Sequence, residues 1–230
     1  MTPRVHREWS NRVAAEYRSA AITAQVLHWL ISVGANDALV STCMRIVRDE
    51  LDHAQLSHDC LVALGGGGQA QLDLSNMAEP TLKEGVVASL LDSVLQNFCL
   101  GETFAVPLFN RMYEGTTQPD ARRVLTRVLQ DEAVHRGFGW DALDALLESD
   151  GQAVRTFVSA RLPHHVARFH QAYAPRRDGV PLTEQERCCG LMDLKDYREV
   201  WTRTYTDDVT RRFAKRGITA PPLGEPHERH

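Results

Sequence analysis

The chain has 230 residues, 43% of them hydrophobic and 24% charged, with a formal net charge of -4 at pH 7 and a sequence pI of about 6.2. This length favours one domain with one sizeable core. The acidic balance disfavours a nucleic-acid surface, and no stretch approaches the roughly 20 apolar residues of a membrane span. The five cysteines show no metal-finger spacing and the first residues lack a signal-peptide apolar run. We therefore expect a cytoplasmic protein without nucleic-acid or membrane partners.

The first two helices are predicted at about 7–33 and 37–64. In both, apolar residues recur every three or four positions, which is typical of helices that pack one face against a core. Glu16 lies in the inward row of the first helix, and Glu50 and His53 lie in that of the second. Polar side chains therefore interrupt two faces that should be buried.

The polar, glycine-rich segment 65–80 should connect the second helix to a third helix at about 81–114. Fully extended, it can span roughly 50 Å, enough to cross a bundle, so the second and third helices could run parallel. Glu102 lies in the inward row of the third helix. Pro107 removes a helical hydrogen bond one turn later, which predicts a kink or a π-bulge beside Glu102.

A fourth helix is predicted at about 119–147, with Glu132 and His135 in its inward row. The short turn before it makes the third and fourth helices an antiparallel hairpin. We expect an all-α protein, because no segment reads as a convincing strand.

Two additional helices are predicted after the fourth, at about 152–173 and 183–214. The whole of 1–220 is then expected to form one helical domain, with a bundle core at about 8–147. The tail 221–230 is expected to be disordered.

Two Glu-x-x-His motifs stand out, at Glu50 and His53 and at Glu132 and His135. Within this chain, a glutamate is followed three positions later by histidine only at these two places. Three residues turn a helix by about 300°, so the two side chains lie roughly 60° apart on one face. One metal ion can therefore take a ligand from both residues of a motif.

Together, the inward rows carry six polar residues. They are Glu16, Glu50, His53, Glu102, Glu132 and His135. An unpaired buried carboxylate costs several kcal/mol, and two divalent cations would neutralise four of them. Oxygen-rich coordination with one imidazole per ion suits iron or manganese better than zinc. We therefore predict a site for two iron ions, with Mn/Fe or Mn/Mn as alternatives. The competing interpretation is a salt-bridge network with Arg12, Arg18, Arg48 or Arg136.

This ordered set resembles the ferritin-like di-iron carboxylate superfamily, over residues 8–147. The resemblance implies a four-helix bundle with a long crossover after the second helix and additional C-terminal helices. It implies Glu16 and Glu102 as terminal ligands, Glu50 and Glu132 as bridging ligands, and His53 and His135 as nitrogen ligands. It also implies that Asp131 holds His53 and Asp49 holds His135, each through the outer ring nitrogen.

The run 131–139 is similar to the corresponding stretch of aldehyde-deformylating oxygenases, whereas Val128 replaces the histidine expected of aminoarene N-oxygenases. The resemblance thus implies an O2-dependent dinuclear non-heme iron oxygenase or oxidase acting on a small organic substrate. An external electron donor such as a ferredoxin with its reductase is expected, and a homodimer is the default assembly. The alternatives are a ferroxidase or iron-handling protein, a manganese catalase, and a non-catalytic protein with a structural metal.

Small residues beside the ligands leave room for a substrate pocket along the bundle axis. They are Ala20, Thr23 and Ala105. The expected walls are Phe98, Cys99 and Phe109. The helices after residue 152, or the distortion at Pro107, would shape the entrance.

Overall fold

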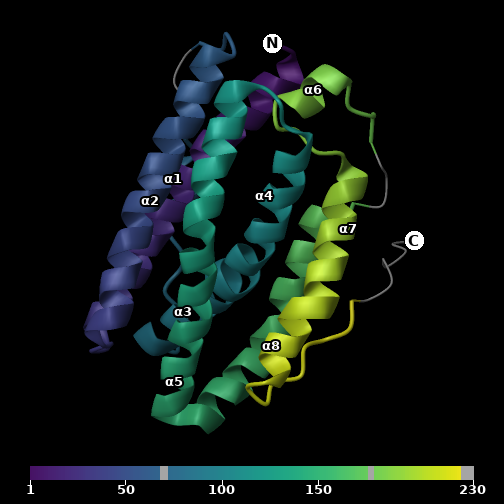
Figure 1. Cartoon of the computed structure of the whole chain (residues 1–230). Coiled ribbons are helices and arrows are strands. Elements are labelled where there is room, and N and C mark those ends of the chain that lie inside the picture. The colour runs from purple at the N-terminus through teal and green to yellow at the C-terminus, as the bar shows by residue number, and fades with distance from the viewer. Residues whose placement is uncertain (68–71, 176–178, 224–230) are drawn as a thin grey trace.

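Helices provide the regular structure of the computed structural model, which describes residues 1–67, 72–175 and 179–223 (Figure 1). No strand occurs within these ranges, so the predicted all-α class is confirmed. None of the helices in the described part of the chain is both long and apolar enough to cross a membrane.

The first two helices, α1 (Pro3–Ser32) and α2 (Asp37–Ala63), pack side by side (Figure 1). The α1 helix begins before the predicted residue 7, because the Thr2 hydroxyl accepts a hydrogen bond from a backbone N–H of the first turn and Pro3 suits the first helical position. The Asn36 side chain caps α2 in the same way. Local capping therefore sets both starting points.

The third predicted helix consists of three consecutive segments. They are α3 (Val86–Ser93), the π-helix η2 (Val94–Glu102) and α4 (Thr103–Gly115). The first of these segments, α3, starts at Val86 rather than near residue 81, because Gly85 has a φ of 101° that cannot continue a right-handed helix. The connection from α2 contains one short 3-10 turn, η1 (Leu74–Asn76). The predicted distortion beside Glu102 is confirmed, since the π-helix ends at that residue.

The long α5 (Pro119–Tyr173) is two helices joined across a kink at Asp150, whose φ and ψ are -150° and 78°. The Asp150 carboxylate accepts a hydrogen bond of 3.1 Å from the Ala153 backbone N–H, and so caps the second half. The predicted separation between a fourth and a fifth helix is therefore confirmed, with the break at Asp150.

The single helix predicted at 183–214 is wrong. The region forms α6 (Glu184–Cys188), α7 (Leu194–Thr204), the π-helix η3 (Tyr205–Val209) and α8 (Thr210–Ala214). Gly190, with a φ of 87°, turns the chain between α6 and α7. A β-carbon there would lie 3.4 Å from the Trp9 ring, so this turn is packed against α1.

The tail predicted to be disordered from residue 221 lies outside the described residues from 224 onward. Before that point, the Tyr205 hydroxyl donates a hydrogen bond to the Pro221 carbonyl, and Leu223 packs against the core. The first residues of this segment are therefore held by the helices, contrary to the prediction.

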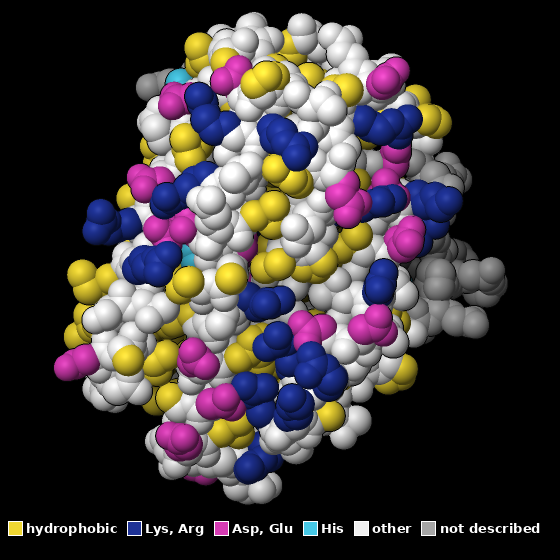
Figure 2. All heavy atoms as spheres, in the orientation of Figure 1, with side chains coloured by type: hydrophobic (Ala, Val, Ile, Leu, Met, Phe, Trp, Pro, Cys, Tyr) yellow, Lys and Arg dark blue, Asp and Glu magenta, His cyan; other side chains and the backbone are white. Residues whose placement is uncertain are grey.

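Two apolar clusters flank the polar rows of the bundle. One includes Trp9, Leu61 and Val124, and the other includes Val26, Ile46 and Phe138. Along α1, α2 and α5, five of the six predicted ligand positions lie between residues of the two clusters, and the sixth, Glu102, lies at the end of η2. The outer surface carries basic and acidic side chains in mixture, with Lys and Arg gathering near α8 (Figure 2). On this face, charged side chains lie at the surface, whereas the predicted ligands lie within the bundle.

The helices α5 and η2 approach each other closely at Gly139, one turn after His135. A β-carbon there would lie 2.5 Å from the Phe98 β-carbon and 2.8 Å from its backbone carbon, whereas at Gly137 it would meet nothing within 4 Å. We expect Gly139→Ala to lower the free energy of unfolding by about 1–3 kcal/mol through overpacking. Gly137→Ala, the matched control, should be neutral or stabilising by up to about 1 kcal/mol. Urea unfolding measures both, and equal effects would contradict this account of the contact.

Candidate metal centre

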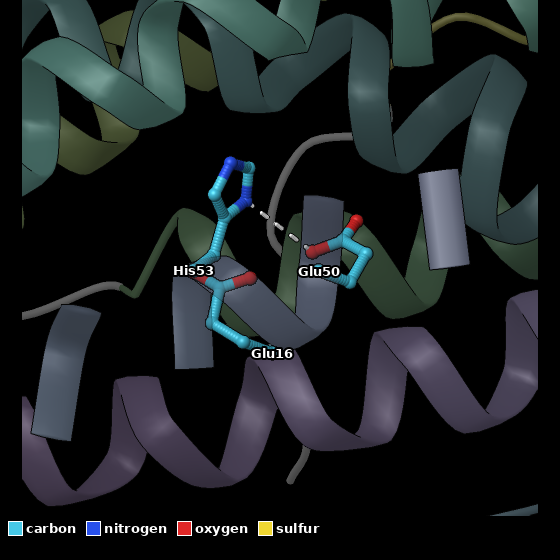
Figure 3. Close-up of side chains that lie close together, drawn as sticks. All are labelled: Glu16, Glu50 and His53. Atoms are coloured by element: carbon cyan, nitrogen blue, oxygen red, sulfur yellow. Dashed lines mark ion pairs between the residues drawn. The ribbon is translucent and has the colours of Figure 1, made fainter. Parts of the chain in front are cut away.

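The structure brings all six predicted ligands into one layer between four helical segments, with Glu16 and Glu102 half-buried and the other four residues buried. Glu16, Glu50 and His53 form a group whose nearest ligand atoms all lie within 4.8 Å of one another, and Figure 3 shows these three side chains. Glu50, Glu102 and His135 form a second such group. Glu132 lies beside the second group, with its Oε2 3.9 Å from His135 Nδ1. Two potential metal positions therefore share Glu50.

Glu50 occupies the centre of this layer. Its Oε2 lies 3.6 Å from His53 Nδ1, and its Oε1 lies 3.4 Å from His135 Nδ1. The two imidazole centroids are 5.8 Å apart. The Ser19 hydroxyl donates a 2.9 Å hydrogen bond to Glu50 Oε1, a contact the sequence analysis missed. Each carboxylate oxygen thus faces a different histidine, an arrangement that fits the bridging role expected for Glu50.

Both histidines leave their inner nitrogen without a hydrogen-bond partner. The Nδ1 atoms of His53 and His135 and the Oε2 atom of Glu132 are buried and unpaired, and both rings are fully buried. Such groups are rare in folded proteins, because each loses its hydration without compensation. Nitrogen and carboxylate donors converging on one point are the ligands that iron and manganese accept. The residues therefore fit a pair of these ions.

The outer nitrogens of the two histidines contact the two aspartates that precede the Glu-x-x-His motifs. His53 Nε2 lies 3.1 Å from Asp131 Oδ2, and His135 Nε2 lies 3.4 Å from Asp49 Oδ2. The predicted crossed pairing is confirmed. A proton held on Nε2 by the aspartate leaves the Nδ1 lone pair free to bind a metal.

Two arginines support the aspartates. Arg45 Nε lies 3.3 Å from Asp49 Oδ2, and Arg127 Nε lies 2.8 Å from Asp131 Oδ2. Each arginine also approaches the other aspartate, at 3.6 and 3.7 Å. Neither arginine was predicted from the sequence, although both stand four residues before their aspartate, the spacing of helical ion pairs.

The competing salt-bridge interpretation finds no support in the ion pairs of the described residues. Among them, no Lys or Arg lies within 4.0 Å of the Glu16, Glu50, Glu102 or Glu132 carboxylates. Arg12 pairs instead with Glu8, and Arg18 with Glu79. The buried carboxylates are therefore not neutralised by arginine.

Burial raises the pKa of Glu16 and Glu132 well above the usual range, and a neighbouring carboxylate adds to the effect. That neighbour is Glu50 for Glu16 and Glu102 for Glu132, and each pair shares a hydrogen bond. The pKa of Glu102 is raised as well, first by burial and then by repulsion from Glu50. Without metal, these carboxyl groups retain protons at pH values where exposed glutamates are ionised.

The pKa of Glu50 is lowered and the pKa of His135 is raised, so both groups favour their charged forms. Burial works against the charged form of Glu50, but the adjacent imidazoles of His135 and His53, 3.4 and 3.6 Å from its oxygens, outweigh burial and hold its pKa below the usual range. Burial likewise opposes the imidazolium of His135, yet the nearby carboxylates of Glu50 and Glu102 raise its pKa to about 9. In the metal-free protein, His135 therefore carries a proton on the inner nitrogen that a metal would use.

A pocket of about 380 Å³ opens beside the four carboxylates. Its apolar lining comprises Ile22, Leu108, Phe109, Met112, Phe169, Tyr173 and Tyr197. Thr23, Ala105 and Phe109 line it as predicted. The helices after residue 152 contribute Phe169, Tyr173 and Tyr197, as expected for the entrance.

Three predicted pocket residues do not line the pocket. Phe98 packs edge-on against Phe138 at 4.9 Å, the Cys99 thiol donates to the Gly139 carbonyl at 3.3 Å, and Ala20 is buried on α1. The π-helix turns Phe98 and Cys99 toward α5 and the core. The sequence could not show this, because a helix-period pattern assumes a uniform turn.

No family model and no curated protein matches this chain. The functional assignment therefore depends on the geometry of the six ligands, the aspartates behind them and the adjoining pocket.

We expect Asp131→Ala to weaken metal binding by roughly 10–100-fold, because His53 would lose the contact that fixes its tautomer and orientation. Asp141→Ala, an exposed aspartate on the same helix, is the matched control and should leave metal affinity unchanged. Competition titration with a chromogenic chelator measures both affinities, and circular dichroism verifies that the helices are retained. Equal affinities in the two variants would contradict the role assigned to Asp131.

Glu132→Gln should stabilise the metal-free protein at high pH. Because the pKa of Glu132 is raised by folding, its stabilising contribution is present at low pH and is lost as the pH rises through the raised pKa. We expect the variant to gain on the order of 1 kcal/mol in free energy of unfolding at about pH 8, and much less at about pH 5. The exposed Glu148→Gln on the same helix is the control. Urea unfolding at both pH values tests this, and a pH-independent difference would contradict it.

Proposed function

We propose that this protein is an O2-dependent dinuclear non-heme iron oxygenase or oxidase with a ferritin-like four-helix core. The core would consist of α1, α2, η2 with α4, and the first half of α5, which pack on one another and each carry ligands. The connection between α2 and α3 would be the long crossover of that fold. The packing order of these segments supports this arrangement.

One observation carries the proposal: two buried imidazole Nδ1 atoms without partners face four carboxylates beside a pocket. Glu16, Glu50 and His53 would hold one ion. Glu50, Glu102 and His135 would hold the other, with Glu132 beside it. When bound, such a metal pair supplies the electrons and open coordination positions needed to activate O2.

The apolar lining of the pocket favours an organic substrate over free iron as the molecule that is oxidised. Hydroxylation of a C–H bond consumes one O2, two electrons and two protons, and yields the alcohol and one water. The substrate supplies only two of the four electrons that O2 accepts. An external donor, such as a ferredoxin with its reductase, would therefore supply the other two.

Three aromatic side chains would exclude water from the reacting side of the pocket. Phe169, Tyr173 and Tyr197 line this side, and the Tyr173 and Tyr197 rings stack with centroids 6.4 Å apart. Burial raises the pKa of both phenols, so they remain neutral. Neutral aromatic walls keep the local dielectric low and strengthen the electrostatic interactions of the site.

Anaerobic reconstitution with Fe(II), followed by exposure to O2, tests the proposal. We expect two irons per chain and a transient visible absorption after mixing with O2. Glu102→Ala should bind at most one iron and lose O2 consumption, whereas the exposed Glu114→Ala at the end of α4 should behave like the wild type. The measurements are metal analysis, stopped-flow absorption and an oxygen electrode.

Other outcomes would replace or overturn the proposal. Iron uptake well beyond two atoms per chain would indicate a ferroxidase or iron-handling protein. Two bound manganese ions with disproportionation of hydrogen peroxide would indicate a manganese catalase. If the chain bound no metal, or if Glu102→Ala retained full O2 consumption, the proposed site would be wrong.

A further inference from the structure

Arg12 is a buried cation in the wall of the pocket that adjoins the carboxylate layer. Only 8% of its surface is exposed, and it lines the pocket together with Glu16. The two residues are four positions apart on α1, so they lie on the same face and about 6 Å apart along the helix axis. Arg12 therefore stands one helical turn from a proposed metal ligand.

The hydrogen bonds of Arg12 are incomplete. Its Nη2 donates to the Gly190 carbonyl at 3.0 Å and contacts the Met112 sulfur at 2.9 Å. Its Nε–H is buried and has no partner among the described residues. The guanidinium also lies 4.9 Å from the Trp9 ring centroid, which holds its plane in place. A buried, immobilised guanidinium with a free donor is prepared to bind an anion.

The charge partner of Arg12 is Glu8, which is partly exposed and lines the same pocket. Glu8 Oε1 is 3.3 Å from Arg12 Nη2, and the Glu8 side chain is 30% exposed. The other arginine in the pocket lining, Arg18, is already engaged, because it donates to the Asn76 carbonyl at 3.0 Å and lies 3.6 Å from Glu79. Arg12 is thus the pocket arginine with an unused buried donor.

We propose that Arg12 binds the carboxylate of the substrate, which would be a small monocarboxylic acid with an apolar body. This inference rests on the proposed function and specifies its substrate class. The apolar body would contact Leu108 and Phe109, which line the same pocket. The reacting carbon would lie about one helical turn, roughly 6 Å, from the carboxylate and beside the layer that contains Glu16.

A purely structural role is the competing explanation. By binding the Gly190 carbonyl, Arg12 joins α1 to the turn between α6 and α7. That role uses Nη2 and leaves the Nε–H donor unused. It predicts that replacing Arg12 changes stability without discriminating charged from uncharged ligands, so ligand charge separates the two explanations.

Fluorine NMR with para-fluorobenzoate as the probe, and para-fluorobenzamide as its uncharged isostere, provides the test. Binding is measured on the purified protein of known metal content and again after chelator treatment. We expect the benzoate to bind at least tenfold more tightly than the benzamide. Arg12→Gln should lower the affinity for the benzoate at least tenfold and leave benzamide binding unchanged. The control Arg7→Gln, at an exposed arginine on the same helix that does not line this pocket, should leave both affinities unchanged.

Glu8→Gln provides a test that does not depend on the folding of the Arg12 variant. Because it removes the carboxylate that competes for Arg12, it should tighten benzoate binding severalfold without affecting the benzamide. Equal binding of the two probes, unchanged benzoate affinity in Arg12→Gln, or weaker benzoate binding in Glu8→Gln would overturn the inference.

The chelator-treated sample separates the two proposals. If the chelator-treated protein binds benzoate through Arg12 but takes up no iron on reconstitution, the anion site is supported and the proposed oxygenase is overturned. Two bound irons with O2 reactivity, but no preference for the benzoate, would support the oxygenase and overturn the substrate class.

Discussion

The buried charge of four carboxylates is the constraint on which this structure depends. Protons offset part of that charge in the metal-free protein, as the raised pKa values of Glu16 and Glu132 show. The inner nitrogens of His53 and His135 remain unpaired even so. Both the electrostatic repulsion and the missing hydrogen bonds would be relieved by two divalent ions. The proposed metal pair is therefore also a proposal about what stabilises the centre of the bundle.

The surroundings of this layer limit how far its side chains can move. The aspartates hold the outer histidine nitrogens, and Arg45 and Arg127 each approach both aspartates. On the other side, the absence of a side chain at Gly139 lets α5 approach the π-helix that ends at Glu102. Side-chain contacts orient His53 and His135, whereas the close packing of the α5 backbone on the π-helix places Glu102. A pre-organised ligand set of this kind loses little entropy when a metal binds.

The layer is closed on the aspartate side and open toward the pocket. The second half of α5 and α7 supply aromatic walls, and α1 supplies Arg12. This asymmetry favours a catalytic metal site over a purely structural one, because a structural site has no need of an adjoining cavity. The proposed carboxylate anchor would hold a substrate against the open side and leave the ligands undisturbed.

The sequence by itself determined the features that depend on local spacing: the π distortion before Pro107, the helical break near Asp150, and the six candidate ligand positions with the aspartates beside them. Helical periodicity places these residues on inward faces whatever their distant partners are. Only the tertiary structure decided the turn at Gly190, the aromatic pocket wall from the second half of α5 and α7, and the burial of Arg12. Residues as distant as Arg12 and Gly190 meet through packing, which leaves no periodic signal in the chain. The π-helix also turns Phe98 and Cys99 away from the predicted pocket. The sequence could not predict this orientation, because a helical pattern carries no record of a widened turn.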